Sequence, residues 1–287
     1  MTKTKSDFVL DAILKALDEG VAPWQKTWKG AHGLPKNLST GKTYRGMNLL
    51  LLGMTDFSSP YWLTFKQAKA LGGQVRGGES ATPIIFWKTI EKERVNRDGS
   101  TGVDKFMLRR HYNVFNLDQI DCIEVPKEPS GGCEFSPIEE AQAIWEGWED
   151  RPTLNHGGAR AYYRPSTDSI QMPKAEDFVS PEAYYATLFH EMGHATGAEK
   201  RLKRPGVTDM DMFGSHKYGV EELVAEMTSA FLCSATGVEG TFDNSVAYMA
   251  SWKKTIQEEG PSIVMRAAGC AQKAFDLLIA SREEVAV

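Results

Sequence analysis

Hydrophobic positions recur at helical spacing in several stretches of the chain, each bounded by capping or helix-breaking residues. The clearest stretch begins with Ser180, Pro181 and Glu182, which offer an N-cap, a proline at the first helical position and an early acid. Gly197 stands where a C-cap glycine is expected, which predicts a helix of about four turns. The other predicted helices are an N-terminal one with Phe8, Ile13, Leu14 and Leu17 on one face, residues 137–148, residues 218–232, and a pair separated near Gly260 and Pro261.

Other segments predict strands and turns. The stretch "PIIFWK" (residues 83–88) is typical of a buried strand, and "YWLTFKQA" (residues 61–68) of a short helix with a core-facing side. Residues 160–173 are expected to form a hairpin whose turn holds residues 165–168. Residues 40–48 and 71–79 look like glycine-rich turns with a basic residue at the tip. The mixture predicts an α+β fold.

A break in the pattern divides the chain in two. Between residues 124 and 136, two prolines and a Ser-Gly-Gly sequence interrupt any regular spacing. We therefore expect one domain over residues 1–123, a linker over 124–136 and a second domain over 137–287. At 287 residues and 41% hydrophobic composition, the chain is long enough for two domains with separate cores. Both domains are expected to be α+β, the second being organised around the helix that starts at Pro181.

Charge divides the chain at nearly the same place. Residues 1–120 hold 18 basic and 11 acidic side chains, a net charge of +7, whereas residues 121–287 hold 15 and 27, a net charge of −12. The N-terminus lacks the continuous apolar run of a signal peptide or membrane span. We therefore expect no membrane partner. The four cysteines show no metal-binding spacing, so we expect free thiols and a cytoplasmic location.

The basic half combines positive charge with aromatic residues. Residues 21–117 hold 15 basic and 6 acidic side chains, with tryptophan, tyrosine and phenylalanine residues between them. Unpaired bases stack on aromatic rings while Lys and Arg follow the phosphates, so this composition indicates single-stranded DNA as a partner. Most of the aromatic residues are nevertheless expected in the core. The candidate DNA contacts are Lys42, Tyr44 and Arg45, followed by Trp24, Lys66, Arg76 and Lys88.

The acidic half contains an H-E-x-x-H motif, in "TLFHEMGHATG" (residues 187–197). His190 and His194 are one turn apart on one helix face, with Glu191 beside them. Two imidazoles so placed can hold one Zn²⁺ while the carboxylate reaches the water that the metal activates. The residues predicted to face the core on this helix are Tyr185, Leu188, Phe189 and Met192.

A catalytic zinc site needs a third protein ligand, and the segment "YGVEELVAEMTSAFL" (residues 218–232) offers glutamates on a second helix. We assign Glu222 as the third ligand and expect Glu226, one turn later, to hydrogen-bond the free nitrogen of a ligating imidazole. Glu226 as the ligand remains an alternative, and Glu221 is a weaker one. Ligand types alone do not choose between Zn²⁺, Mn²⁺ and another divalent ion.

These residues predict a metallopeptidase mechanism. Glu191 is the expected general base, passing a proton from water to the leaving amine. His216 or Tyr218 is the candidate donor to the developing oxyanion. Zincins commonly align substrate as an added strand at a sheet edge beside the metal helix, and the hairpin over residues 160–173 is the nearest candidate for that edge.

Both halves together resemble the ArdC-type antirestriction proteins of conjugative plasmids and related mobile elements, over roughly residues 8 to 280. The resemblance implies an N-terminal domain that binds single-stranded DNA, as in some plasmid primases, and a C-terminal zincin metallopeptidase domain related to SprT-like peptidases. It implies that the protein protects incoming plasmid DNA from restriction in the recipient cell. It places the family's metal motif on His190, Glu191 and His194. The matching stretches are "GVAPWQKTW", "PKNLSTGKTYRGMNLLLL", "YWLTFKQAKALGGQVRGGE", "YNVFNLDQ", "FHEMGHATG", "RLKR" and "YGVEELVAEM".

Three functions remain open. The first is a DNA-tethered zinc protease whose substrate is unidentified, with restriction enzymes or other DNA-bound proteins as candidates. The second is a protein that protects single-stranded DNA by coating it, with a structural or non-proteolytic metal site. The third, a DNA mimic that titrates restriction enzymes, needs an acidic surface throughout, and the +7 charge of the N-terminal half argues against it.

Overall fold

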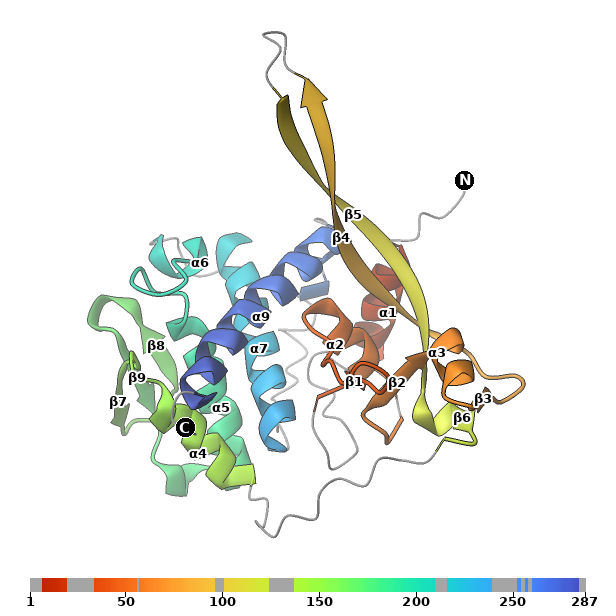
Figure 1. The fold of residues 1–287 in the computed structure, drawn as a ribbon. Coiled ribbons are helices and arrows are strands. Elements are labelled where there is room, and N and C mark those ends of the chain that lie inside the picture. Colours follow the sequence, from red (N-terminus) through yellow and green to blue (C-terminus); the bar gives the residue numbers. More distant parts are fainter. Residues whose placement is uncertain are drawn as a thin grey trace.

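The computed structural model describes residues 7–19, 34–55, 57–95, 101–123, 137–209, 216–238, 252–253, 256–257 and 260–283. Within these ranges the chain forms two parts that lie side by side, with helix α9 (Pro261–Glu283) against helices of both (Figure 1). Each part combines helices with a small sheet, which confirms the predicted α+β class. The predicted linker, residues 124–136, lies outside the described residues.

The N-terminal part is built on a four-stranded sheet. Its elements are α1 (Asp7–Asp18), β1 (Lys36–Asn37), α2 (Met47–Gly53), β2 (Tyr61–Thr64), α3 (Phe65–Ala70), β3 (Gln74–Val75), β4 (Thr82–Val95), β5 (Thr101–Asn116), the 3-10 helix η1 (Leu117–Gln119) and β6 (Ile120–Asp121). The strand order is β1-β2-β5-β4, in which β1 is parallel to β2 and the other neighbours are antiparallel. Strands β3 and β6 form a separate antiparallel pair.

Residues 61–70 differ from the single short helix predicted for "YWLTFKQA". The first four residues form β2, and the helix begins only at Phe65. Thr64 ends the strand and caps the helix, because its hydroxyl accepts a hydrogen bond from the Gln67 amide while the Gln67 side chain accepts one from the Thr64 amide. Tyr61 and Leu63 point into one core cluster and Trp62 into another, so both faces of β2 are apolar. Periodicity cannot tell such a strand from a buried helix.

Strands β4 and β5 form a long hairpin that projects from the body of the protein (Figure 1). The prediction of a strand at residues 83–88 is confirmed, but burial ends early: Ile84 and Ile85 are buried, whereas Phe86 is 55% exposed. The hairpin base is fixed to α2 by Asn48, whose side chain accepts a hydrogen bond from the Ile85 amide at 2.8 Å and donates one to its carbonyl at 2.7 Å. The rest of the hairpin extends past the helices that could bury it.

The C-terminal part packs helices against a three-stranded sheet. Its elements are α4 (Pro137–Gly147), β7 (Thr153–His156), β8 (Tyr162–Arg164), the 3-10 helix η2 (Pro165–Thr167), β9 (Ser169–Met172), the 3-10 helix η3 (Ala175–Asp177), α5 (Pro181–Ala195), α6 (Pro205–Thr208), α7 (His216–Thr236) and α9. The strand order is β7-β9-β8, and β8 and β9 form the hairpin predicted over residues 160–173. Helices α5 and α7 pack against each other and, with α9, enclose the main core.

Helix α9 also holds the N-terminal part. Ile13 and Leu17 of α1 belong to the same buried cluster as α9 residues such as Ile263 and Val264. The Gly46 amide donates a hydrogen bond to the Gln272 side chain at 2.7 Å. These contacts join the two parts through their hydrophobic core as well as through the chain between them.

Two expectations from composition concern cysteines and membranes. Three of the four cysteines lie in the described ranges, and all three are free thiols: exposed Cys122, buried Cys233 and half-buried Cys270. Cys133 lies outside those ranges. Neither α9 nor any other helix in the described ranges is both long and apolar enough to cross a lipid bilayer.

An ion-pair cluster fixes the turn of the β8–β9 hairpin to the loop after α5. The Arg201 guanidinium bonds both carboxylate oxygens of Asp168, at 2.7 and 3.0 Å, and lies over the ring of Trp148. The Tyr163 hydroxyl donates to Asp168 at 2.8 Å. Burial acts to raise the pKa of Asp168, but bonds from Arg201, Tyr163 and Lys200 lower it to about 2. The hairpin turn is therefore held by a carboxylate that stays ionised to low pH.

We expect Asp168→Asn to lower the free energy of unfolding at pH 7 by about 1–2 kcal/mol. The pKa of Asp168 falls on folding, from 3.8 to about 2. The contribution of Asp168 to the free energy of unfolding is therefore complete above about pH 4 and is lost as the pH falls toward about 2. The difference between wild type and variant, measured by urea unfolding at several pH values, should therefore shrink over that window. Exposed Asp177→Asn is the matched control, and a difference independent of pH would contradict the prediction.

Candidate metal centre

Helix α5 begins and ends through local interactions. The Ser180 hydroxyl accepts a hydrogen bond from the Ala183 amide, and Pro181 occupies the first turn. At the other end the helix stops where predicted, with Thr196 as the C-cap and Gly197 directly after it, but Gly197 does not adopt the left-handed conformation of a glycine cap. Gly197 instead allows a close approach, because a Cβ there would lie 2.8 Å from a guanidinium nitrogen of Arg204. The core-facing side is confirmed, since Tyr185, Leu188, Phe189 and Met192 are buried.

Gly193, between the two histidines, lets α7 approach this face of α5. A Cβ at Gly193 would lie 2.9 Å from the Cα of Ala225, closer than real Cβ atoms come to backbone. The absence of a side chain therefore permits direct backbone packing between the two helices. This contact brings the glutamates on α7 next to the histidines on α5.

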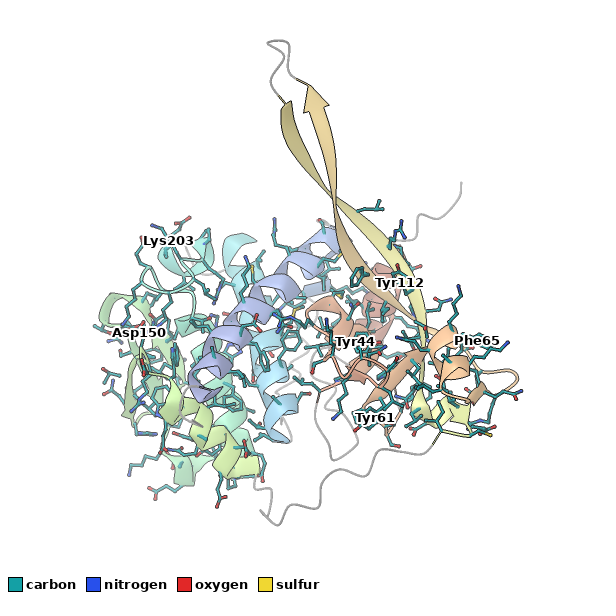
Figure 2. All side chains as sticks on the ribbon, viewed as in Figure 1. Tyr44, Tyr61, Phe65, Tyr112, Asp150 and Lys203 are labelled. Carbon is teal, nitrogen blue, oxygen red and sulfur yellow. The ribbon has the colours of Figure 1, made fainter. Side chains whose placement is uncertain are left out.

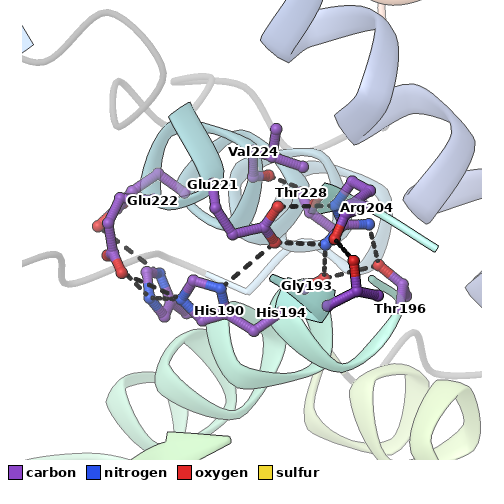
Figure 3. A network of polar contacts seen from close by, with 11 residues as sticks. His190, Gly193, His194, Thr196, Arg204, Glu221, Glu222, Val224 and Thr228 are labelled. Atoms are coloured by element: carbon purple, nitrogen blue, oxygen red, sulfur yellow. Dashed lines mark hydrogen bonds and ion pairs between the residues drawn. The ribbon is translucent and has the colours of Figure 1, made fainter. Parts of the chain in front are cut away.

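Three side chains from the two helices converge on one point (Figure 3). The Nε2 atoms of His190 and His194 are 3.1 Å apart. The two carboxylate oxygens of Glu222 lie 3.6 Å from His190 Nε2 and 3.4 Å from His194 Nε2. Ligand atoms held about 2.0–2.1 Å from a tetrahedral ion are about 3.3 Å apart, so this donor set fits a single divalent cation. Within the described residues this is the one cluster of three such donors.

The remaining imidazole nitrogens face two further carboxylates. His190 Nδ1 lies 3.6 Å from Glu226, and His194 Nδ1 lies 3.4 Å from Glu221. A carboxylate at Nδ1 holds the proton there and leaves Nε2 free as a ligand. The structure thus places Glu222 beside the Nε2 atoms of both histidines, Glu226 at Nδ1 of His190 and Glu221 at Nδ1 of His194.

A buried arginine, which the sequence analysis did not assign to the site, fixes Glu221. The guanidinium of Arg204, 7% exposed, donates to both carboxylate oxygens of Glu221, at 2.6 and 2.9 Å. It also donates to the Gly193 carbonyl at 2.6 Å and to the Thr196 hydroxyl at 2.8 Å (Figure 3). Arg204 therefore connects the end of α5 to the start of α7. In the sequence, Arg204 is part of the basic stretch "RLKR" (residues 201–204), and nothing in this stretch indicates a contact with Glu221.

The electrostatics of the site favour positive charge between the carboxylates. Burial lowers the pKa of His190, and the neighbouring His194 lowers it further. Burial also acts to lower the pKa of His194, but hydrogen bonds to Glu221 and Glu222 raise it well above its usual value. For Glu221, burial acts to raise the pKa, yet Arg204 and His194 hold it below its usual value. An ionised Glu221 and a proton-retaining His194 mark a position suited to a cation.

Glu191, the proposed general base, follows His190 on α5 and is 6% exposed. The two proposed oxyanion donors, His216 and Tyr218, belong to the first turn of α7, and their side chains lie outside the described part of the chain. The structure therefore shows the cluster of His190, His194 and Glu222 and the helix that carries Glu191, while the roles of general base and oxyanion donor remain predictions.

The predicted DNA contacts are spread over the N-terminal part. Tyr44 is half-buried, and its hydroxyl accepts a hydrogen bond from Asn37 at 3.2 Å. Arg45 forms an ion pair with Asp276 of α9 at 2.5 Å, and Arg76 forms ion pairs with Glu79 and Asp121. Lys42 and Lys66 are exposed, whereas Trp24 and the side chain of Lys88 lie outside the described part. Figure 2 shows Tyr44 on the body of the protein, where it packs against the core cluster that holds Ile84 and Val114 at the base of the β4–β5 hairpin.

Comparison with known protein families gives one match for each half. Residues 4–115 match the N-terminal domain of the anti-restriction factor ArdC, and residues 140–269 match a zincin-like metallopeptidase domain. A crystal structure of the antirestriction ArdC protein from plasmid R388, in metal-free form, is 32% identical with a TM-score of 0.77, covering 98% of each chain. Its Mn(II)-bound form is 33% identical with the same TM-score, covering 97% of this chain and 98% of the other.

Longer proteins contain a similar region. A DNA primase TraC from Escherichia coli is 37% identical over 295 residues, which cover 97% of this chain but only 20% of the primase. A second TraC from Escherichia coli is 38% identical and is covered over 28% of its length. The protein y4eC of Sinorhizobium fredii (strain NBRC 101917 / NGR234), described as uncharacterized, is 34% identical, with 96% of this chain and 92% of that protein covered.

Proposed function

The chain belongs to the ArdC family of antirestriction proteins, and from this premise we propose that it protects plasmid DNA entering a restricting cell by combining single-stranded DNA binding with proteolysis. The observation that carries the proteolytic half is the cluster of His190, His194 and Glu222, in a domain that matches zincin-like metallopeptidases. The substrate class is a protein bound at or near the incoming DNA, with restriction enzymes as candidates.

His190, His194 and Glu222 would hold a divalent ion, for which Zn²⁺ is our first candidate and Mn²⁺, found in the R388 relative, the second. Such an ion supplies Lewis-acid activation of a water and of the scissile carbonyl. Glu226 and Glu221 orient the two imidazoles through their Nδ1 atoms, and Arg204 keeps Glu221 ionised and in place.

Glu191 takes the role of proton carrier in this proposal. A carboxylate next to a ligating histidine can accept a proton from water and deliver it to the amine of the leaving peptide. Its burial limits exchange with bulk water, which suits a group that must return the same proton. His216 or Tyr218 would donate to the oxyanion.

The substrate chain is proposed to add to the edge of the C-terminal sheet. Strand β8 is an edge strand of the order β7-β9-β8, and it packs against α5, which carries the metal ligands. An extended peptide at such an edge gains main-chain hydrogen bonds in register with the strand. The ion-pair cluster at Asp168 fixes the turn that follows β8, and so keeps this edge rigid.

Removing and restoring the metal tests the proteolytic half. We expect wild-type protein with Zn²⁺ or Mn²⁺ to cleave a fluorescently labelled unfolded protein, with a chelator abolishing cleavage and either ion restoring it. Each condition is measured with and without oligo-dT, because DNA could be required to deliver substrate. A protein that demonstrably binds metal and yet cleaves nothing in any condition would favour the alternative, in which the protein protects single-stranded DNA by coating it.

A further inference from the structure

The projecting hairpin exposes apolar side chains on one face. Phe86 and Tyr112 are 55% and 42% exposed, and their rings meet edge to face with centroids 6.1 Å apart. Leu108, on the same strand as Tyr112, is 39% exposed. Exposed aromatic side chains grouped in this way are typical of a binding surface. Tyr112 lies where the hairpin leaves the body of the protein (Figure 2).

The register of β4 and β5 places these residues together. Phe86 is directly opposite Arg110, and Ile84 is directly opposite Tyr112. Directly opposite residues share a face of the sheet, and so do residues two positions along each strand. Phe86, Leu108, Arg110 and Tyr112 therefore lie on one face, which we call the arm face.

The same register separates the charges of the hairpin. The ladder positions of the arm face carry four basic residues and one acidic residue, whereas the opposite set carries two of each. The arm face set is Lys88, Lys92, Arg94 and Arg110 with Asp104, and the opposite set is Lys105 and Arg109 with Glu91 and Glu93. Of these charged residues, Arg110 has a described side chain, and it is exposed on the same face as Phe86 and Tyr112.

Arg110 also differs from the other arginines considered as DNA contacts. Arg45 and Arg76 are neutralised by carboxylates of the protein itself. Arg110 is exposed, and among the described residues none forms an ion pair with it. Within the described part of the chain, Arg110 therefore has no ion pair to break before it neutralises a phosphate.

We propose that the arm face binds single-stranded nucleic acid, with bases stacking on Phe86 and Tyr112 and phosphates lying against Arg110. This inference rests on the proposed function, since it locates the DNA-binding site of that function on the hairpin. Aromatic platforms flanked by cations bind single strands with little sequence preference, because every base has a face that can stack. Duplex DNA, whose bases are already stacked, should bind this face more weakly.

The stacking contribution is tested by replacing the two rings. We expect Phe86→Ala and Tyr112→Ala each to weaken binding to a labelled oligo-dT by about 5- to 100-fold in fluorescence anisotropy. Phe65→Ala is the matched control, because Phe65 is an aromatic residue on α3 of the N-terminal part and is 57% exposed. The affinity of this variant for oligo-dT should equal that of wild type. Phe86→Tyr, which keeps a ring, should retain binding even if an alanine variant is poorly folded.

Two further experiments separate the contribution of the bases to binding from that of the phosphates. On an abasic oligonucleotide of equal length, Phe86→Ala should bind as wild type does, since no base remains to stack. Arg110→Ala should reduce the slope of log K against log salt by about 0.7, as expected for one lost phosphate contact on a single strand. Arg160→Ala, at an exposed arginine of the C-terminal part, is the control and should leave that slope at the wild-type value.

The outcomes distinguish this inference from the function on which it rests. If wild-type protein binds oligo-dT and the Phe86 and Tyr112 variants bind equally well, the assignment of DNA binding to the arm face is overturned, while single-stranded DNA binding by the protein stands. If wild-type protein does not bind oligo-dT, the DNA-binding half of the proposed function fails as well. If the same variants lose binding to vesicles with anionic lipid but keep binding to oligo-dT, the surface recognises a membrane and the proposal is overturned.

Discussion

Glu191→Ala is expected to reduce peptide-bond hydrolysis by about 100- to 10,000-fold while the metal ion remains bound. The ligands His190, His194 and Glu222 are untouched, and the carboxylate removed is the proposed proton carrier rather than a ligand. Metal content by atomic absorption, DNA affinity and the unfolding midpoint should therefore match wild type. Glu191→Gln, which keeps the size of the side chain and removes its basicity, should give the same loss.

The same variant decides whether proteolysis is the means of protection. Wild type and Glu191→Ala are compared, at equal protein levels, for protection of unmodified DNA delivered as a single strand into a restricting cell. Loss of protection with DNA affinity intact would identify proteolysis as the mechanism. Full protection by the variant would contradict it and favour protection by binding alone. Glu199→Ala, an exposed glutamate just after α5, is the matched control.

Arg204→Ala is expected to cost about 3–5 kcal/mol of stability, because it leaves the buried carboxylate of Glu221 without its cation. Since Glu221 also faces His194 Nδ1, loss of its anchor should weaken metal affinity by about 10- to 100-fold. Stability is measured by urea unfolding of the metal-free protein, and metal affinity by competition with a chelating dye. Separate measurement matters because bound metal itself stabilises the fold.

Two variants separate the charge of Arg204 from its packing. Arg204→Ala combined with Glu221→Gln should be less destabilised than the sum of the single changes, since a neutral amide does not need the cation. Arg160→Ala, at an exposed arginine of the same part, is the control and should be neutral within about 0.5 kcal/mol. A stable Arg204→Ala protein with wild-type metal affinity would show that Arg204 does not position the site.

The sequence alone carried the features that depend on neighbours along the chain. The spacing of His190 and His194 places both on one face of a helix whatever that helix packs against, and the Ser180 cap and Pro181 define where it starts. The β8–β9 hairpin and the division of charge between the two halves were readable for the same reason. Each follows from local periodicity, local capping or simple composition.

Only the tertiary structure decided how separate elements meet. Which glutamate of α7 faces both Nε2 atoms depends on the rotation of α7 against α5, and that rotation is set by backbone packing at Gly193 and Ala225. Arg204 reaches Glu221 across 17 residues, a contact that no local pattern encodes. Likewise Arg45 is paired with Asp276, 231 residues away, while Arg110 stays free of such a pair among the described residues. Periodicity specifies which face of a helix or strand a residue occupies, whereas packing specifies what that face meets.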